Sequence, residues 1–328
     1  MACSRLQGCV ILLKNADKTG IGEMNSLLRE ILEKCSGFAA QGKVADYIPE
    51  LSNANANHFG IAVLNENGAL SFAGDYQEKF TMQSIVKPLI LLLALSDRGA
   101  ERVRELVGVE ATGKPFDAFN YSDQALKSEH INPMINTGAI ALCTLINGDS
   151  YADKFARLLA LTRKMTGNPH IQVNERVYLS EKATGNKNRA LAYMLKAYGM
   201  LDGDVEEIVD LYFRACSIEV DCQDLANVAF VLANHGKNVD TGEQIVKAEY
   251  ARYVNAVLTT SGMYDGSGEF ALSVGMPAKS GVGGGIMAVA PRRMGVGIYS
   301  PALDKKGNSV AGKKALELLS QSLNLSIF

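Results

Sequence analysis

Several features that mark large protein classes are scarce or absent in this sequence of 328 residues. Tryptophan is absent, and the six cysteines are scattered without a CxxC pair. This spacing favours free thiols in a reducing cytoplasm over a disulfide framework. The histidines lie far apart and form no HExxH or similar ligand pattern, so metal chemistry has little support; they are His58, His130, His170 and His235.

Charge and long apolar runs are also limited. The formal net charge is −2, and no Lys/Arg cluster is present, so the sequence offers no argument for nucleic-acid binding. The apolar stretch 88–95 is far shorter than the roughly 20 residues needed to span a bilayer, and Asp97 and Arg98 close it. The start has no basic run before its short apolar segment and no clear cleavage site, which argues against a signal peptide. We therefore expect a cytoplasmic protein without nucleic-acid or membrane partners.

Hydrophobic residues make up 47% of the chain, which predicts one large domain or two interlocked subdomains. Helical spacing predicts an amphipathic helix over 23–35. Residues 58–75 read as two short strands joined by Asn67-Gly68, a strong hairpin signal. A further helix is expected over 84–96, because Pro88 is tolerated only in a first helical turn and Gly99 can end it.

The rest of the chain predicts an α/β (α+β) fold. Residues from about 100 to 260 show mostly helical spacing, and 284–301 return to short strands broken by Pro and Gly. An amphipathic helix follows over 308–323. An early hairpin and two late strands predict one antiparallel sheet built from both chain ends, with helices packed on it and a helical subdomain beside it. A site is expected in the cleft between these parts.

Ser84 and Lys87 are the first candidates for chemistry. They lie one turn apart at a predicted helix start, so the Lys87 amine can reach the Ser84 hydroxyl. Burial beside the run "LILLLAL" and the field of the helix N-terminus both favour a neutral lysine. A serine activated by such a lysine is a recognised nucleophile–base pair. Because Ser-x-x-Lys also arises by chance on solvated helix surfaces, the pair needs a partner motif.

The partner motif is Lys279-Ser280-Gly281, on a predicted late strand. It resembles the K-[ST]-G strand of serine acyl-transferases that use Ser-x-x-Lys, and its glycines allow close approach of a substrate. Lys18-Thr19-Gly20 also matches but reads as a turn near the N-terminus. A β-lactam-handling enzyme would add an S-x-N or Y-x-N element. The only candidate, Tyr253-Val254-Asn255, belongs to a helical apolar stripe and favours a core role for Tyr253.

Seven stretches together resemble the serine-dependent glutaminases, relatives of the β-lactamase and DD-peptidase fold, and the sequence resembles their short, bacterial-type form. The match covers about residues 38–325 in the expected order and leaves 1–37 unmatched. The stretches are "ADYIPEL" (45–51), "FTMQSIVKP" (80–88), "INPMINTGAIAL" (131–142), "LSEKATGNKNRALAYML" (179–195), "YFRACSIEV" (212–220), "TSGMYDGSGEFALSVGMPAKSGVGGGIMAV" (260–289) and "SPALDKKGNSVAGKKALE" (300–317).

The resemblance implies hydrolysis of L-glutamine to L-glutamate and ammonia without metal or organic cofactor. Ser84 would attack the γ-amide carbon and Lys87 would take its proton. The N–H groups of Ser84 and Val282 would hold the oxyanion. Tyr264 would pass a proton to the departing ammonia, and its flanking glycines suit a mobile lid. Lys279, Ser280 and Gly281 are supporting residues.

The resemblance also assigns the substrate's charged end. Glu181 would bind the α-ammonium group, and Tyr47 would lie beside the nucleophile. The carboxylate would be fixed by Asn136, Asn188 and Tyr212.

Each of these residues has an ordinary structural alternative. Glu181 would otherwise serve as a carboxylate in a first helical turn, and the two asparagines as helix caps. The two tyrosines would lie at core edges, and Lys279 would pair with a nearby acid.

Two positions depart from the family pattern. Thr137 replaces the usual alanine, and Lys187 replaces the arginine common before Asn188. We expect these two changes to affect affinity more than activity.

The rival functions are a serine acyl-transferase acting on β-lactams or peptidoglycan, and a catalytically silent amino-acid-binding protein. We expect an N-terminal extension over 1–37, then one catalytic domain over 38–328. Its sheet subdomain would use about 38–80 and 260–328, its helical subdomain about 100–260. The family implies a homo-oligomer, dimer or tetramer.

Overall fold

The computed structural model describes residues 20–111 and 128–328. Cys3, Cys9 and most of the Lys18-Thr19-Gly20 match lie outside these residues. The α-helices are residues 20–35, α2 (Lys87–Leu106), α3 (Asn136–Cys143), α4 (Tyr151–Thr166), α5 (Glu175–Thr184), α6 (Asn186–Ala197), α7 (Val205–Cys216), α8 (Cys222–Ala233), α9 (Ala248–Ser261), α10 (Ser267–Ser273) and α11 (Val310–Leu323). Short 3₁₀ turns are η1 (Ser36–Gln41), η2 (Pro49–Asn53), η3 (Gln83–Val86), η4 (Ser128–His130) and η5 (Tyr264–Gly266).

The main sheet has five antiparallel strands in the order β2-β1-β7-β6-β5. They are β1 (Gly60–Asn65), β2 (Leu70–Gly74), β5 (Ala278–Ser280), β6 (Gly285–Ala290) and β7 (Met294–Tyr299). A separate two-stranded ladder joins β3 (Phe80–Thr81) to β4 (Glu219–Val220). Because β1 from the start of the chain pairs with β7 near its end, the predicted sheet of both chain ends is confirmed.

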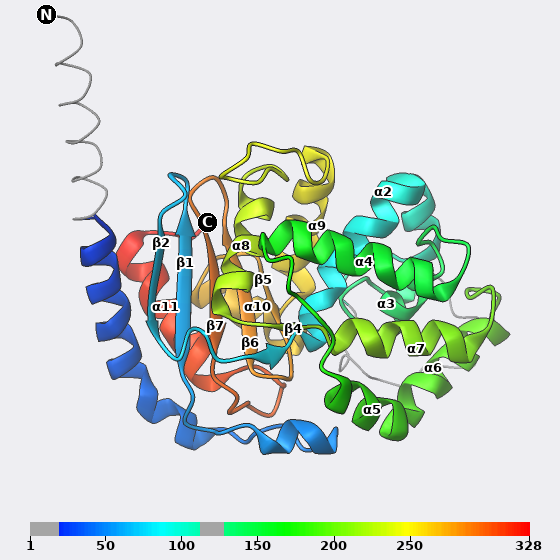
Figure 1. Cartoon of the computed structure of the whole chain (residues 1–328), viewed down its shortest axis with the longest axis horizontal. Coiled ribbons are helices and arrows are strands. Elements are labelled where there is room, and N and C mark those ends of the chain that lie inside the picture. Colours follow the sequence, from blue (N-terminus) through cyan, green and yellow to red (C-terminus); the bar gives the residue numbers. More distant parts are fainter. Residues whose placement is uncertain (1–19, 112–127) are drawn as a thin grey trace, which may run out of the picture.

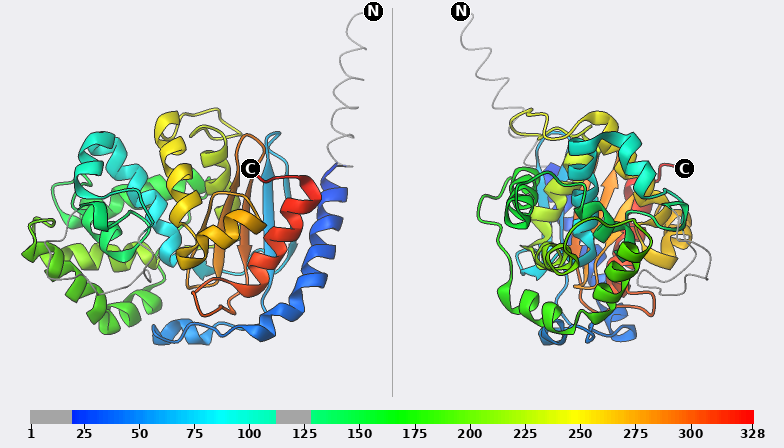
Figure 2. Two further views of the ribbon diagram at one scale, coloured as in Figure 1. Left: turned by 180° about the vertical axis from the view of Figure 1, so that it is seen from behind. Right: turned by 90° about the vertical axis from the view of Figure 1, so that its right-hand side faces the viewer.

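Alternation along the strands divides the interior into two cores. In β1, Ile61 and Val63 pack with α11 and the helix over 20–35, whereas Ala62 and Leu64 face the core that contains α8. This period of two is the ordinary consequence of strand geometry. Figure 1 shows α11 and the N-terminal helix beside the sheet, and α3 to α7 gathered in a separate group, an arrangement that the left view of Figure 2 repeats from behind.

The predicted local elements are largely confirmed. The hairpin turns at Gly68, whose φ of +74° suits glycine, and α11 closely matches the predicted final helix. The helix expected from Ser84 begins as the 3₁₀ turn η3 and becomes α-helical at Lys87, with Pro88 in its first turn. At Gly99 a φ of +79° interrupts α2, which then continues to Leu106.

Helix α8 comes from the middle of the chain and packs directly on the sheet. Two glycines of β7 make this approach possible, because a Cβ at Gly295 would lie 2.2 Å from the carbonyl oxygen of Ala226. At Gly297 it would lie 2.1 Å from the carbonyl oxygen of Cys222. The division into sheet and helical subdomains stays a prediction, since the helix-rich segment contributes α8 to the sheet core.

Residues 20–111 and 128–328 lack two features that would indicate a membrane or metal role. No helix there is long and apolar enough to cross a membrane. In the same residues, no group of three or more His, Cys, Asp or Glu side chains could hold a metal ion.

We predict that Gly297→Ala destabilises the fold, because the new methyl group meets α8 backbone atoms that no side-chain rotation can move. The expected loss in free energy of unfolding is about 3 kcal/mol. Gly268→Ala in α10 is the control, since a Cβ there meets nothing within 4 Å. That change should be neutral or stabilise by up to about 1 kcal/mol in urea unfolding. Equal unfolding midpoints for both variants would contradict the tight sheet–helix contact.

Candidate active site

Ser84 and Lys87 meet at the junction of η3 and α2. The Nζ atom of Lys87 lies 2.5 Å from Oγ of Ser84, and both side chains are buried. Helix geometry produces this contact, since residues three apart lie on one face. The predicted pairing of this serine and lysine is therefore present in the structure.

Burial sets the charge state of Lys87. Its side chain is fully buried, and the apolar residues from Leu89 to Leu95 that follow it are buried in the core. This burial lowers the pKa of Lys87 to about 8, although Cys216 and Glu181 act in the opposite direction. A normal lysine keeps its proton to about pH 10.4. At pH 8 about half of the Lys87 amines are therefore neutral and able to accept a proton.

The residue before Ser84, Gln83, has a left-handed backbone with φ of +48°. Such a conformation in a non-glycine residue is costly and concentrates at functional sites. Its buried side chain donates from Nε2 to Oγ1 of Thr81 at 3.3 Å and also hydrogen-bonds Glu181. The sequence did not single out Gln83, because its only signal was its place next to Ser84.

One cavity unites Ser84 with most of the residues that the resemblance selects. Its lining is Tyr47, Ile48, Gln83, Ser84, Asn136, Glu181, Thr184, Gly185, Lys187, Asn188, Tyr212 and Cys216. Sequence reasoning missed Ile48, Thr184, Gly185 and Cys216, which carry no motif of their own. The residues that line the cavity come from segments far apart in the chain, so only the fold brings them together.

Two asparagines and a tyrosine form a hydrogen-bonded chain on one wall. Nδ2 of Asn136 donates to Oδ1 of Asn188 at 2.9 Å, and the hydroxyl of Tyr212 donates to Oδ1 of Asn136 at 3.2 Å. Asn136 is the first residue of α3 and Asn188 lies inside α6, and neither side chain caps its helix. The helix-cap alternative is therefore wrong for both residues.

Glu181 places a buried carboxyl group in the same cavity. It lies in the second turn of α5 rather than the first, so the first-turn alternative is also wrong. Burial raises the pKa of Glu181 to about 8, while the hydrogen bond from Gln83 and the charge of Lys87 oppose this shift. Within the described chain, its buried Oε2 has no hydrogen-bond partner. A buried acceptor without a partner is rare and favours a ligand that donates a hydrogen bond.

Tyr264 approaches Ser84 from the other side. Its φ is +54°, and its hydroxyl donates to the carbonyl oxygen of Ser280 at 3.0 Å. Burial raises the pKa of Tyr264 above that of an ordinary phenol, and a hydrogen bond with Ser84 opposes this. The phenol therefore keeps its proton at neutral pH, and in this structure that proton is directed to the carbonyl oxygen of Ser280.

Lys279 holds the backbone around Tyr264. Its fully buried Nζ donates to the carbonyl oxygens of Gly262 at 3.0 Å and Ser280 at 2.7 Å. The same atom lies 4.2 Å from the centre of the Tyr264 ring. The expected alternative of an acidic partner is wrong, since these carbonyls take that place. Burial, then the charge of Lys87, lowers the pKa of Lys279.

The loop between β5 and β6 lies against the segment that leads into Ser84. A Cβ at Gly281 would lie 2.5 Å from the carbonyl oxygen of Met82, and one at Gly283 would lie 2.7 Å from that of Thr81. Val282 sits between them and packs with Ile48. Its N–H donates to no acceptor in residues 20–111 or 128–328. The geometry therefore offers a backbone donor near Ser84, as an oxyanion site requires.

The remaining candidate residues lie in different parts of the structure, some at the Ser84 cavity and some outside it. Tyr47 lines the cavity but is 55% exposed, so it is not a core-edge residue. Thr137 is buried at the start of α3, and Lys187 is exposed at the cavity rim. Tyr253 packs against the main core, and Asn255 donates to the carbonyl oxygen of Leu232 at 3.0 Å. The Tyr253–Asn255 stretch lies outside the Ser84 cavity, so the structural role predicted for Tyr253 is confirmed.

Comparison with known proteins gives consistent matches. A family model described as Glutaminase matches residues 42–328. A glutaminase of Clostridium tetani (strain Massachusetts / E88) is 50% identical over 305 residues, which are 93% of this chain and 100% of that protein.

Two solved structures from Bacillus subtilis have similar folds. A probable glutaminase complexed with 6-diazo-5-oxo-L-norleucine has a TM-score of 0.85 and 37% identity, over 93% of this chain and 96% of that chain. A covalent complex of a glutaminase with 5-oxo-L-norleucine has a TM-score of 0.84 and 37% identity, over 92% of this chain and 98% of that chain.

We predict that the reactivity of Ser84 follows the deprotonation of Lys87. Because the Lys87 pKa is lowered, the rate of Ser84 modification by an uncharged fluorophosphonate should rise with pH, with a midpoint of about 8. At pH 7 the rate should be about a tenth of its plateau. Intact-mass spectrometry with Ser84→Ala as the blank measures the rate. A midpoint above pH 10, or no change from pH 6 to 9, would contradict a neutral Lys87.

Proposed function

The chain belongs to the glutaminase family, and we propose that it hydrolyses L-glutamine to L-glutamate and ammonia through an acyl-enzyme on Ser84. One observation carries the assignment of residues. A serine lies 2.5 Å from a buried, partly neutral lysine in a cavity that also holds an unpartnered carboxyl oxygen and an Asn–Asn–Tyr chain. A serine, a lowered-pKa amine, a carboxyl group and neutral hydrogen-bonding groups thus lie together, which supports these roles.

Acylation begins with proton transfer from Oγ of Ser84 to the neutral amine of Lys87. Oγ then forms a bond to the amide carbon of glutamine, and the carbonyl electron pair moves onto the oxygen. The N–H groups of Ser84 and Val282 stabilise this oxyanion. The Ser84 N–H lies in the first turn of η3, where N–H groups have no intrahelical partner, and the Val282 N–H in the β5–β6 loop donates to no acceptor in the described residues. The carbon–nitrogen bond then breaks.

Tyr264 protonates the leaving nitrogen, and ammonia departs. Its phenol is close enough to hydrogen-bond Ser84. Lys279 holds the carbonyl of Gly262, two residues before Tyr264, and the carbonyl of Ser280, which accepts from the phenol. The proton held by Lys87 returns to the tyrosine. In the second half of the cycle, water gives a proton to Lys87 and attacks the acyl carbon. The bond to Oγ breaks, and Ser84 regains its proton as glutamate leaves.

The charged end of glutamine fits the polar groups that line the same cavity as Ser84. Its α-ammonium group would pair with the Oε2 atom of Glu181, and its carboxylate would lie against Asn136, Asn188 and Tyr212. Binding of a cation favours the ionised form of Glu181, whose pKa is otherwise about 8. The incoming ammonium also offsets the field of the new carboxylate at Lys87. The base therefore keeps its lowered pKa when substrate is bound.

The two rival functions have less support. A β-lactam-directed enzyme would need Tyr253 and Asn255 beside Ser84, but these residues lie outside its cavity. A silent binding protein would have no use for a buried lysine against the serine. The assay of ammonia release tests this binding-protein alternative directly.

Three further proposals concern the whole protein. A cytoplasmic location is supported by four free, buried cysteines, Cys35, Cys143, Cys216 and Cys222. The proposal that the protein forms a dimer or tetramer is based on the family resemblance. A catalytic domain over 38–328 after an extension over 1–37 is supported by the family match, which begins at residue 42.

We predict that Ser84→Ala lowers ammonia release from L-glutamine by about 10⁴-fold or more, since loss of a nucleophile removes the covalent route. A coupled glutamate dehydrogenase assay on purified protein measures this, with L-asparagine as a second substrate. No turnover by the unaltered chain would favour the binding-protein alternative, and turnover that survives in Ser84→Ala would contradict the nucleophile.

We predict that Glu181→Gln raises KM for glutamine far more than it lowers kcat, because the variant loses a charged hydrogen bond to the α-ammonium. A loss of about 1.5–3 kcal/mol corresponds to a 10- to 100-fold rise. Glu175→Gln, exposed on the same helix, is the matched control and should leave KM within twofold. An unchanged KM in Glu181→Gln would reject this role.

A further inference from the structure

A second cavity, of about 610 Å³, lies away from the catalytic residues and shares no lining residue with their cavity. It reaches Ala290 at the end of β6, whereas the glycine loop beside Ser84 precedes the start of that strand. Its volume falls within the range of small-molecule sites, about 300–1,000 Å³. Nothing in the reaction above uses it.

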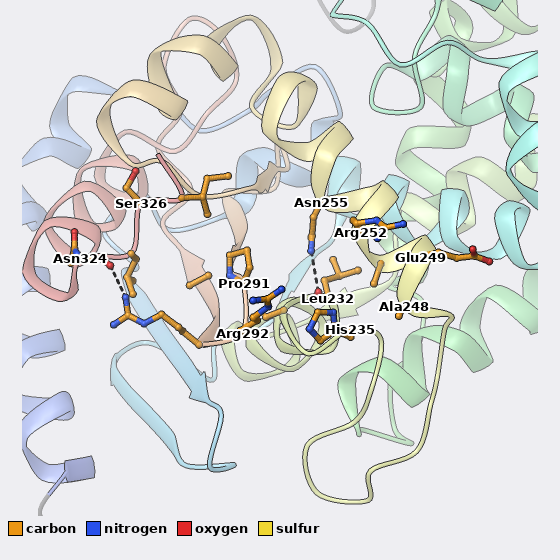
Figure 3. Close-up of a pocket in the computed structure, with 16 residues that line it drawn as sticks. Leu232, His235, Ala248, Glu249, Arg252, Asn255, Pro291, Arg292, Asn324 and Ser326 are labelled. Carbon is orange, nitrogen blue, oxygen red and sulfur yellow. Dashed lines mark hydrogen bonds between the residues drawn. The ribbon is translucent and has the colours of Figure 1, made fainter.

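Four segments far apart in the sequence enclose this cavity. They are the end of α8 with His235, the first half of α9, the β6–β7 turn around Arg292, and the chain end at 324–327. Figure 3 shows Asn255 on α9 across the opening from Pro291 and Arg292, with Arg252 beside Asn255 on the same helix. The site therefore depends on the folded sheet and both helices.

The floor of the cavity is apolar. Leu232, Ala251, Ala290 and Leu325 line it, and each is at most 3% exposed. Such a floor favours a ligand with a hydrocarbon or aromatic body.

The rim carries a surplus of positive charge in a chain whose net charge is −2. Two charged residues of the lining already have partners. Oε1 of Glu249 lies 3.9 Å from Nζ of Lys247, and Arg293 donates to the carbonyl oxygens of Leu323 and Asn324 at the end of α11. Arg252 and Arg292 are exposed, and their side chains make no hydrogen bond or ion pair with the rest of the described chain. Two guanidinium groups thus remain for an anion, which their planar forks bind well.

Backbone conformation sets this cavity apart from the remaining surface. Across residues 20–111 and 128–328, five non-glycine residues have positive φ. Two of them, Gln83 and Tyr264, lie at the catalytic site, and the other three line this cavity: His235, Arg292 and Asn324. Asparagine at a helix end adopts this conformation readily, but histidine and arginine do so at a cost of about 1 kcal/mol or more. The β6–β7 turn thus has an arginine at position 292, where a glycine would be less strained.

We propose that this cavity binds a small organic anion. Its carboxylate, sulfonate or phosphate group would lie between Arg252 and Arg292, and its apolar body would cover the floor formed by Leu232, Ala251, Ala290 and Leu325. This proposal is independent of the assignment of Ser84 and Lys87.

The test uses 8-anilinonaphthalene-1-sulfonate, an aromatic sulfonate whose fluorescence rises in apolar surroundings, titrated into the full chain. The double variant Arg252→Gln/Arg292→Gln should weaken binding at least tenfold. The control Arg29→Gln/Arg102→Gln removes the same charge from exposed positions outside the cavity and should stay within twofold. Ala248→Trp, at an exposed position on the cavity wall, should also weaken binding by filling the space.

Competition then tests the apolar half of the proposal. Octanoate should displace the dye at concentrations where inorganic phosphate does not. Equal displacement by phosphate would overturn the role of the floor. Dye binding that is unchanged in the double variant, or that saturating L-glutamate abolishes, would overturn the site itself. Circular dichroism melting of each variant confirms that it is folded.

Discussion

The burial of one amine is the constraint on which the catalytic account depends. The apolar half of α2 builds the centre of the main core, and the same packing removes water from Lys87 at its first turn. Without burial almost none of the Lys87 amines would be neutral near pH 7, whereas a pKa of about 8 leaves about a tenth of them neutral and able to accept the serine proton. The core that stabilises the fold thus also supplies the base, which links folding to catalysis through a single helix.

Close backbone packing places the other groups around that helix. Glycines at 281 and 283 bring the β5–β6 loop against the segment that precedes Ser84, and the glycines of β7 bring α8 against the sheet. Gln83 and Tyr264 hold left-handed conformations beside the nucleophile. Such strain persists only where surrounding structure over-determines it, so the rigid sheet and helices sustain the geometry that the reaction needs.

Local patterns predicted much of this structure. The hairpin at Asn67-Gly68, the helical segment beginning near Ser84 with Pro88 in the first turn of α2, and the joining of both chain ends in one sheet followed from turn chemistry and periodicity. The contact between Ser84 and Lys87 followed from helical spacing. Glu181, Asn136 and Asn188 came only from the family resemblance, because they lie on separate helices and meet through tertiary packing. The strained backbone of Gln83, the packing of α8 and the arginine-rimmed cavity had no local signal, since each depends on segments distant in sequence.

The most direct test of the central claim is the ionisation of Lys87 itself. Carbon-13 labelling of lysine Cε allows each amine to be titrated by NMR, and the resonance missing from Lys87→Arg identifies the residue. The account predicts that this resonance titrates with a midpoint of about pH 8. A midpoint above pH 10, as for an ordinary exposed lysine, would show that Lys87 is not the base that activates Ser84.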